Sequence, residues 1–508
     1  MQAIKEKIKQ KVLQLFGNYR WWDLVMLILI LSLGLAARLT DLNDLPLDFH
    51  PTRQLHSMII ARGMYYDNLK SAPDWQRTMA VSQWQSEEQI EPPIMERLTA
   101  IGYRLVGNDD LRIPRLLSIF FWIVGAVGLY LLSRDLVGSK GALVGLAYFL
   151  LLPYNIYASR SFQPEPLMVA AIIWSWWCLI KWVKQRNWKN AILAGVLAGF
   201  AIFVKLPAIF FVAPALLAAF LVDQKLKQVI SDPQIWTIGI LAILPALIYH
   251  VDGLYISGFL KGQTSLRFFP NLWIQPYTYL KWKDNIEKTL IFEMFLISIF
   301  GILIIKPKKI RIMFISIICG YFLYGMFFSY HIMSHNYYQI PFTPAVAVGL
   351  SITSGVLIKK LNGKKVFALL MLGGLISFWM ASNFYTVTQN LSSSNYSKEM
   401  TFYESLGEDL RNYNVVSITP DYGYRLSYWG WKDSVNWFST ADLTLRGLAG
   451  TNIDVKTEFS KAIKGSDMFL VTDFSEFDRQ TQIQKTLYEN YPIFDEGEGY
   501  IIFDLRDQ

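Results

Sequence analysis

The 508-residue chain is rich in apolar side chains and poor in charge. Hydrophobic residues make up 53% of it and charged residues only 17%, whereas soluble globular proteins usually carry about a quarter charged residues. This composition excludes a soluble globular protein and predicts a polytopic membrane protein. The net charge of +8 does not indicate a nucleic-acid partner, because Lys and Arg fall in short clusters between apolar runs, as cytoplasmic loops do.

Lysines and arginines crowd the segment before the first apolar run, which predicts that the N-terminus stays in the cytoplasm. No small-residue cleavage site follows this segment, so we expect the first span to be retained. Both cysteines, Cys178 and Cys319, lie inside apolar runs. The sequence therefore predicts neither a disulfide framework nor a thiolate metal site.

Apolar runs of membrane-crossing length recur along the chain and predict about eleven transmembrane helices. The runs on either side of Lys205 are short, but basic loops precede the first and follow the second, which predicts two crossings. An odd total places the C-terminus outside. The runs occupy residues 23–37, 116–132, 141–157, 167–183, 190–204, 208–222, 235–251, 289–305, 312–330, 341–358 and 366–384.

A long loop, residues 38–113, follows the first span on the outer face. It carries two segments with helical periodicity. In the first, apolar residues from Leu55 to Leu69 share one face, and in the second, apolar residues from Ile94 to Leu105 do so. We expect both helices to lie along the bilayer surface.

From about residue 386 the composition turns polar and stays so, over a length that suits one small domain. The sequence thus predicts an all-α polytopic membrane domain over residues 1–385 and a small extracytoplasmic α/β domain over residues 386–508. Short β-strands are expected at residues 415–419, 468–472 and 500–505, and a helix at residues 480–491.

Asp48, just beyond the first span, is the first candidate catalytic residue. A partly desolvated carboxylate at the membrane surface can act as a general base on a hydroxyl or an amine. Alternatively, Asp48 caps the helix that follows it. Arg62, on the apolar face of that helix, either extends to the interface or meets a lipid phosphate. His50, Arg53 and His56 complete the cluster.

Glu165 lies in a short outer loop close to Arg160. Acidic residues at membrane depth are costly, so they are usually functional or paired. The ordinary alternative for Glu165 is therefore an ion pair with Arg160 or another outer arginine. Lys205 lies at the outer turn of the short hairpin, where it either contacts a phosphate or marks the interface.

Residues 329–344 open a further outer loop with His331, His335, Tyr337 and Tyr338. Imidazole and phenol donors at the mouth of a span suit an anionic head group, whereas tyrosine alone is expected in any aromatic belt. A divalent metal on the two histidines has no support from a nearby acidic ligand. The absence of P-loop, dinucleotide-binding, G-x-S-x-G and H-E-x-x-H motifs argues against nucleotide-driven chemistry in a soluble fold.

This layout resembles the GT-C class of polytopic glycosyltransferases that use polyprenyl-phosphate sugars, and within it the protein O-mannosyltransferase and aminoarabinose-transferase-like branch. Four features within roughly the first 380 residues carry the resemblance. They are the long first outer loop with Asp48, the motif Glu91-Pro92-Pro93, the second outer loop with Ser159-Arg160 and Glu165-Pro166-Leu167, and His335-Asn336-Tyr337-Tyr338 before Pro341.

One departure concerns the first loop. Relatives often place an Asp-Glu pair after a Phe-His-Pro like Phe49-His50-Pro51, whereas this chain has Thr52-Arg53 there. The acid in this stretch is instead Asp48, ahead of the motif. Altered chemistry or a different acceptor is one reading of this change.

The resemblance implies a membrane glycosyltransferase that moves a sugar from a polyprenyl phosphate to an unknown acceptor on the extracytoplasmic face, with inversion at C1. Asp48 would take the proton from the acceptor, and Glu165 is the second catalytic candidate. His50 and His56 are further site candidates. The residues expected to bind the donor phosphate or lipid are Arg53, Arg62, Arg160, Lys205, His335, Tyr337 and Tyr338.

Two other classes stay open. A transporter or lipid flippase also needs many spans and intramembrane charge, but common transporter folds show repeats and broken helices near the midplane. Here the unusual residues gather at the outer face beside a long loop. A surface-anchoring or polymer-assembly protein without catalysis would tolerate changes at the acid and histidine positions.

Overall fold

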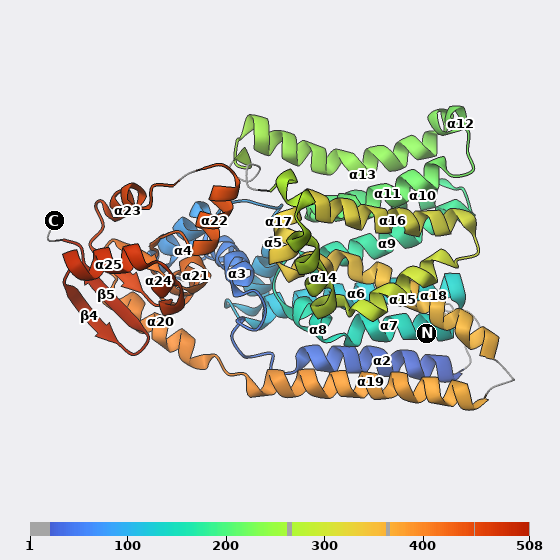
Figure 1. Cartoon of the computed structure of the whole chain (residues 1–508), viewed down its shortest axis with the longest axis horizontal. Helices are drawn as coiled ribbons and strands as arrows, with labels where there is room; N and C mark the ends of the chain where they lie inside the picture. Colours follow the sequence, from blue (N-terminus) through green and yellow to red (C-terminus); the bar gives the residue numbers. More distant parts are fainter. Residues whose placement is uncertain (1–20, 262–266, 362–365, 452, 507–508) are drawn as a thin grey trace.

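The computed structural model describes residues 21–261, 267–361, 366–451 and 453–506. A bundle of aligned helices forms one end of the molecule and a smaller unit with a β-sheet forms the other (Figure 1). The first-loop helices α3 (Pro51–Tyr66) and α4 (Asp74–Ser86) lie between them. The basic N-terminal segment, on which the predicted orientation depends, lies outside the described residues.

The long helices of the bundle lie side by side, with α2 and α19 together along one edge and α13 along the opposite edge (Figure 1). They are α2 (Trp21–Leu39), α6 (Arg112–Val137), α7 (Ser139–Leu151), α9 (Glu165–Lys184), α10 (Trp188–Val204), α11 (Ile209–Leu221), α13 (Pro233–Val251), α15 (Phe292–Leu303), α16 (Lys308–Phe327), α18 (Thr343–Leu361) and α19 (Val366–Ser393). The connecting helices are α8 (Pro153–Arg160), η1 (Leu206–Ala208), α12 (Leu226–Ser231), η2 (Asp252–Ile256), η4 (Pro270–Ile274), α14 (Pro276–Leu290), α17 (Ser329–Ser334) and η5 (Asn336–Phe342).

Six helices in the described part of the chain are long and apolar enough to cross a membrane, or seven spans if the bent pair α7 and α8 counts as one. Shorter apolar helices accompany them at Trp188–Val204, Leu206–Leu221 and Phe292–Leu303. This confirms an integral, multi-pass membrane protein. The total of eleven spans stays a prediction.

The span predicted over residues 141–157 is not one continuous helix, because the helix breaks at Leu152. α7 ends at Leu151, α8 begins at Pro153, and the two helices are bent by 61°. Leu152 is extended, with φ −62° and ψ 123°. The ring of a proline disfavours the helical conformation at the residue before it, which explains the break.

Both predicted loop helices form, but α3 is not the one-sided helix that its periodicity predicts. Eleven of its 16 residues are buried. It packs against α4, α5 (Ile94–Val106) and α21 (Tyr424–Trp429), and the last of these belongs to the C-terminal unit. The second face of α3 is thus covered by a partner that is distant in the sequence. The loop also contains α4, which the apolar pattern does not predict.

The C-terminal unit contains a five-stranded sheet in the order β2-β1-β3-β5-β4. The strand β1 pairs in parallel with β2 and β3, and β5 runs antiparallel to β3 and β4. The three predicted strands are confirmed as β1, β3 and β5, and the predicted helix as α25. The strands are β1 (Val415–Ile418), β2 (Val435–Asn436), β3 (Met468–Val471), β4 (Ile493–Gly497) and β5 (Tyr500–Asp504). The helices are α20 (Ser397–Asp409), η6 (Pro420–Gly423), α21, α22 (Thr440–Leu448), α23 (Val455–Ile463), α24 (Phe474–Arg479) and α25 (Thr481–Asn490).

The central strand β3 is buried on both faces of the sheet. Met468 and Leu470 belong to the same hydrophobic core as Tyr403 of α20 and the bundle. Phe469 and Val471 face a second core within the C-terminal unit. Because successive side chains of a strand point to opposite faces, one face of the sheet contributes to the core that includes the bundle and the other to the core of the C-terminal unit.

Candidate functional site

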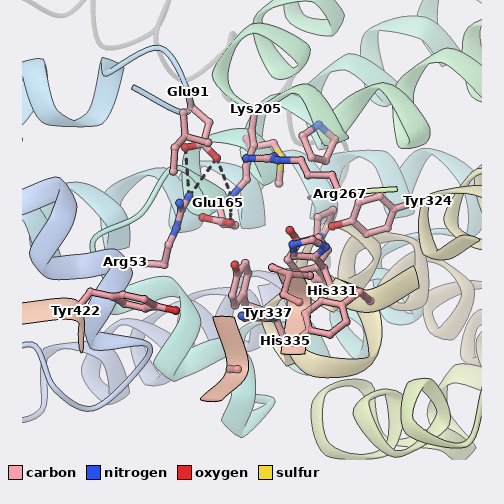
Figure 2. A pocket seen from close by; sticks show the side chains of 18 of the residues that line it. Arg53, Glu91, Glu165, Lys205, Arg267, Tyr324, His331, His335, Tyr337 and Tyr422 are labelled. Atoms are coloured by element: carbon pink, nitrogen blue, oxygen red, sulfur yellow. Dashed lines mark hydrogen bonds and ion pairs between the residues drawn. The ribbon is translucent and has the colours of Figure 1, made fainter. Parts of the chain in front are cut away.

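A cavity of about 260 Å³ lies where the bundle, the first loop and the C-terminal unit meet. Charged and aromatic side chains dominate its wall (Figure 2). The charged ones are Arg53, Glu91, Glu165, Lys205, Arg267 and Asp442. The tyrosines and histidines are Tyr324, Tyr330, His331, His335, Tyr337, Tyr338 and Tyr422.

The first turn of α3 brings Arg53 to the cavity. His50, just before this helix, has a left-handed φ of 43°. Its Nε2 lies 2.8 Å from Asn336 Oδ1, and the Tyr154 hydroxyl donates to the same oxygen at 2.9 Å. His50 therefore fastens the start of α3 to η5, which carries the two tyrosines of the His-x-Tyr-Tyr motif.

Positive and negative side chains alternate along one wall of the cavity (Figure 2). Arg53 Nη2 donates to both carboxylate oxygens of Glu91, at 3.1 and 3.2 Å. The Lys205 Nζ lies 3.3 Å from Glu91 Oε1 and forms a second ion pair with Glu165. Burial disfavours the charged Glu91, but Arg53 and Lys205 outweigh it and lower the pKa of Glu91 to about 2. Each charged side chain along this wall therefore has a neighbour of opposite charge.

Glu165 is the first residue of α9, where the helix dipole favours a carboxylate. Its side chain is only 2% exposed. One carboxylate oxygen, Oε1, accepts from Lys205, while Oε2 has no hydrogen-bond partner among the described residues. The cavity is therefore lined by a carboxylate that has one buried oxygen without a hydrogen-bond partner among the described residues.

The histidines of the late outer loop stack at the cavity wall. The ring centres of His331 and His335 are 5.8 Å apart, and Tyr338 stacks on His331 at 5.5 Å. Burial lowers the pKa of His335 to about 4 and that of His331 to about 3, so both rings are neutral at pH 7. Within the described ranges, no group of three His, Cys, Asp or Glu side chains is arranged to hold a metal.

The C-terminal unit supplies Tyr422 and Asp442 to the cavity. Asp421 and Tyr422 have φ values of 54° and 57°, a left-handed conformation that is costly for residues with a side chain. Thr52 Oγ1 donates to Asp421 Oδ1 at 2.8 Å and Arg425 Nε to Asp421 Oδ2 at 2.7 Å. The Tyr422 hydroxyl donates to Asp442 Oδ1 at 3.0 Å. Contacts on both sides thus hold the strained turn at the cavity.

Asp48 is not among the residues that line this cavity. Its carboxylate lies 3.3 Å from Arg115 Nη2 and 3.6 Å from Arg160 Nε, and all three side chains are at most 8% exposed. The alternative pairing of Glu165 with Arg160 is therefore wrong, because Arg160 pairs with Asp48 and Glu165 with Lys205. The capping alternative for Asp48 is wrong too, since His50 holds the N-cap position of α3 and no side-chain cap bond forms.

Arg62 and His56 also lie outside the cavity. Arg62 is buried between the rings of Tyr428 and Trp431, whose centres are 4.4 and 4.0 Å from its guanidinium carbon. It thus joins α3 to the C-terminal unit instead of extending to a membrane interface. His56 Nε2 lies 3.4 Å from Glu87 Oε2 beside a neighbouring small hollow.

Seven further polar cavity residues are not among the predicted site residues, namely Glu91, Arg267, Tyr324, Tyr330, His331, Tyr422 and Asp442. Glu91 stands in the Glu91-Pro92-Pro93 motif, and His331 is the first of two histidines four positions apart, so both carry a visible signal. Tyr330 lies in the same outer-loop segment as His331, whereas Arg267, Tyr324, Tyr422 and Asp442 carry no local signal. Each comes from an element that only the folded chain brings to the cavity.

Residues 90–250 match the family model of dolichyl-phosphate-mannose-protein mannosyltransferases. A comparison with curated proteins gives no significant match. The structure of ArnT from Cupriavidus metallidurans bound to undecaprenyl phosphate aligns with a TM-score of 0.59 and 12% identity, over 96% of this chain and 98% of that one. The archaeal oligosaccharyltransferase AglB from Archaeoglobus fulgidus, in complex with an inhibitory peptide and a dolichol-phosphate, aligns with a TM-score of 0.57 and 11% identity, over 89% of this chain and 69% of that one. The chain therefore has the GT-C fold of these membrane proteins.

Proposed function

We propose that the protein is a membrane glycosyltransferase that transfers a sugar from a polyprenyl-phosphate donor to an acceptor on the extracytoplasmic face. The observation that carries this proposal is the cavity, which Arg53, Lys205 and Arg267 line together with the carboxylates of Glu91 and Glu165. Cations suit the donor phosphate and a carboxylate suits the acceptor proton. The family match and the GT-C fold support the same reaction class. None of the matches described above is a transporter or flippase.

The proposal includes an orientation and a division of the chain. The N-terminus is cytoplasmic, and the cavity and the C-terminal unit face outward, as the alternation of basic loops predicts. Residues 1–385 form the transmembrane domain and residues 386–508 the extracytoplasmic domain. Because α19 continues to Ser393, the outer domain begins with the last turns of that helix.

The cations would bind the phosphate of the donor. Arg53 and Lys205 already contact carboxylates, so a bound phosphate shares cations that are charged and positioned beforehand. As the sugar leaves, negative charge grows on the phosphate oxygen, and fixed donors shielded from water stabilise that charge strongly. Neutral His335 and the hydroxyls of Tyr337 and Tyr338 add uncharged hydrogen-bond donors.

Glu165 would be the general base. The acceptor oxygen or nitrogen attacks C1 of the sugar, the bond from C1 to the phosphate oxygen breaks, and the acceptor proton passes to the carboxylate of Glu165. The electron pair stays on the departing polyprenyl phosphate, and C1 inverts. In this scheme Asp48 is a positioning residue, since it pairs with two arginines away from the cavity.

The test is transfer by purified protein in lipid nanodiscs. Radiolabelled undecaprenyl-phosphate sugars are offered with panels of lipid, glycan and peptide acceptors, and wild type is compared with Glu165→Gln. Wild type is expected to transfer label from one donor, and Glu165→Gln is expected to bind that donor without transfer. Absence of transfer by wild type from every donor in a broad panel would overturn the proposal.

A further inference from the structure

We propose that the protein also binds an anionic diacyl phospholipid, in a groove on the side of the bundle away from the cavity. The groove consists of two adjoining hollows that share Phe300. The first, of about 890 Å³, lies between α7, α15, α18 and α19 and is called the apolar hollow. The second, of about 570 Å³, lies at the ends of α6, α15 and α18 and is called the lysine hollow.

The apolar hollow is suited to hydrocarbon chains. Its wall consists mostly of aliphatic and aromatic side chains from four helices. The hydroxyls of Tyr148, Thr353 and Ser354 also line it, but each already donates to a backbone carbonyl, at 2.8 to 3.1 Å. These hydroxyls therefore require no polar partner from a ligand. Acyl chains would fill this space without leaving a polar group unpaired.

The lysine hollow adds positive charge at one end of the groove. Lys306 after α15 and Lys359 and Lys360 at the end of α18 line it. None of the three forms an ion pair with a carboxylate in the described part of the chain, whereas nearby Lys308 pairs with Asp223 at 2.9 Å. Three lysines that have no carboxylate partner among the described residues, beside a hollow for hydrocarbon, complement the phosphate of an anionic lipid.

The position of the groove distinguishes this lipid from the glycosyl donor. The lysine hollow adjoins the start of α16 and the cavity adjoins its end at Tyr324. A helix of 20 residues is about 30 Å long, so the two sites lie near opposite membrane surfaces. In the proposed orientation, on which the choice of leaflet rests, the lysines face the cytoplasmic leaflet, where anionic lipids concentrate.

Native mass spectrometry of the full chain tests the proposal without any transfer assay. Purified protein in detergent is titrated with dioleoyl-phosphatidylglycerol and with dioleoyl-phosphatidylethanolamine, which has the same acyl chains and no net charge. Wild type is expected to retain the anionic lipid preferentially. Lys306→Gln, Lys359→Gln and Lys360→Gln are each expected to weaken its binding about fivefold, and a variant that combines all three is expected to lose the preference for the anionic lipid, with the zwitterionic lipid unaffected.

The matched control changes the same number of charges elsewhere on the same membrane side, through Lys189→Gln, Lys225→Gln and Lys227→Gln combined. This control is expected to keep the preference for the anionic lipid. If the control loses that preference as fully as the combined Lys306, Lys359 and Lys360 variant, net charge alone explains the effect and the proposed site is overturned. Equal retention of both lipids by wild type would overturn it as well.

A second variant tests whether the acyl chains of the lipid occupy the apolar hollow. Leu357→Trp puts a larger ring at the wall of that hollow and is expected to weaken retention of phosphatidylglycerol while the three lysines remain. Unchanged retention would show that the acyl chains lie elsewhere. Undecaprenyl phosphate that displaces phosphatidylglycerol from wild type at equal concentration would assign the groove to the donor lipid instead, and so overturn the proposal. A failure of glycosyl transfer leaves all of these readouts unaffected.

Discussion

Arg53 and Glu91 meet through one guanidinium nitrogen that donates to both carboxylate oxygens, at 3.1 and 3.2 Å. The contact joins the first turn of α3 to the segment that precedes α5 and so closes one wall of the cavity. Lys205 shares the same carboxylate. A change at Glu91 therefore alters the charge and the shape of the site together.

Glu91→Gln is expected to lower the free energy of unfolding by about 1–3 kcal/mol, because two largely buried cations lose their carboxylate. Arg53→Gln should lower the free energy of unfolding less in the Glu91→Gln variant than in wild type. The folded pKa of Glu91 lies near 2, below its ordinary value of 4.5, so the contribution is complete above pH 4.5 and disappears as the pH falls toward 2. A double-mutant cycle on unfolding in detergent measures the coupling. Strictly additive effects would contradict it.

His335 should make stability depend on pH at mildly acidic values. Its folded pKa of about 4 lies below its ordinary value of 6.5 because burial penalises the charged ring. Between these values the unfolded chain binds the proton and the folded chain does not, so stability decreases as the pH falls from 6.5 to 4. His335→Gln is expected to lose less stability over this window than wild type. His250→Gln on α13 is the control, and parallel curves for wild type and His335→Gln would refute the prediction.

Glu165 and Asp48 should differ in what their loss affects. Glu165→Gln is expected to reduce the rate of transfer about 10²- to 10⁴-fold, the usual contribution of a general base, with the protein still folded. Asp48→Asn leaves Arg115 and Arg160 without a carboxylate partner and should cost about 3–5 kcal/mol of stability, with the rate per folded molecule largely kept. Single-turnover rates and thermal unfolding, measured on the same samples, separate the two. A folded but inactive Asp48→Asn would return the catalytic role to Asp48.

Tyr422, in its left-handed turn, should lower the stability of the protein and improve its binding of the acceptor. Asn tolerates this backbone conformation better than Tyr, so Tyr422→Asn is expected to raise the unfolding temperature, by an amount that corresponds to about 1 kcal/mol. The same change removes the ring and the hydroxyl from the cavity. The KM for the acceptor should rise while donor binding is unchanged. A lower unfolding temperature would show that the lost hydrogen bond from Tyr422 to Asp442 outweighs the backbone strain of the turn.

Arg62 should govern the attachment of the C-terminal unit. Arg62→Ala removes the guanidinium from between Tyr428 and Trp431 and its hydrogen bond to Gln83, and is expected to cost about 2–4 kcal/mol. Arg62→Lys should rescue little, since an ammonium lacks the planar surface and the fork of donors. Limited proteolysis should release the C-terminal unit faster from both variants. Equal cleavage rates for wild type and Arg62→Ala would disprove this role.

Much of the fold is readable from local patterns. Membrane-length apolar runs predict the bundle, and apolar runs such as the one from Met468 to Val471 predict the central strands because those strands are buried on both faces. The strand β4 is not predicted because every residue in it is exposed. The strand β2 is not predicted because it has only two residues. The break at Leu152 was accessible from Pro153, whose effect on the preceding residue is local.

The site is less readable, because its contacts join distant parts of the chain. The hydrogen bond between Arg53 and Glu91 joins residues that are 38 positions apart in the sequence. The one between Asp48 and Arg115 joins residues that are 67 positions apart. Charge and position alone made Asp48 and Glu165 similar candidates. Only the folded chain separates them, because one carboxylate pairs with two buried arginines and the other lines the cavity with an oxygen left unpaired.

The burial of α3 has a consequence for how the protein is made. This helix leaves the ribosome early, yet Arg62 binds a carbonyl 366 positions later in the chain. In the proposed orientation, its second face stays uncovered until α21 has been synthesised and has crossed the membrane. The cavity is therefore complete only after Tyr422 and Asp442 have also crossed the membrane, and truncation before η6 would leave an inserted bundle without a finished site.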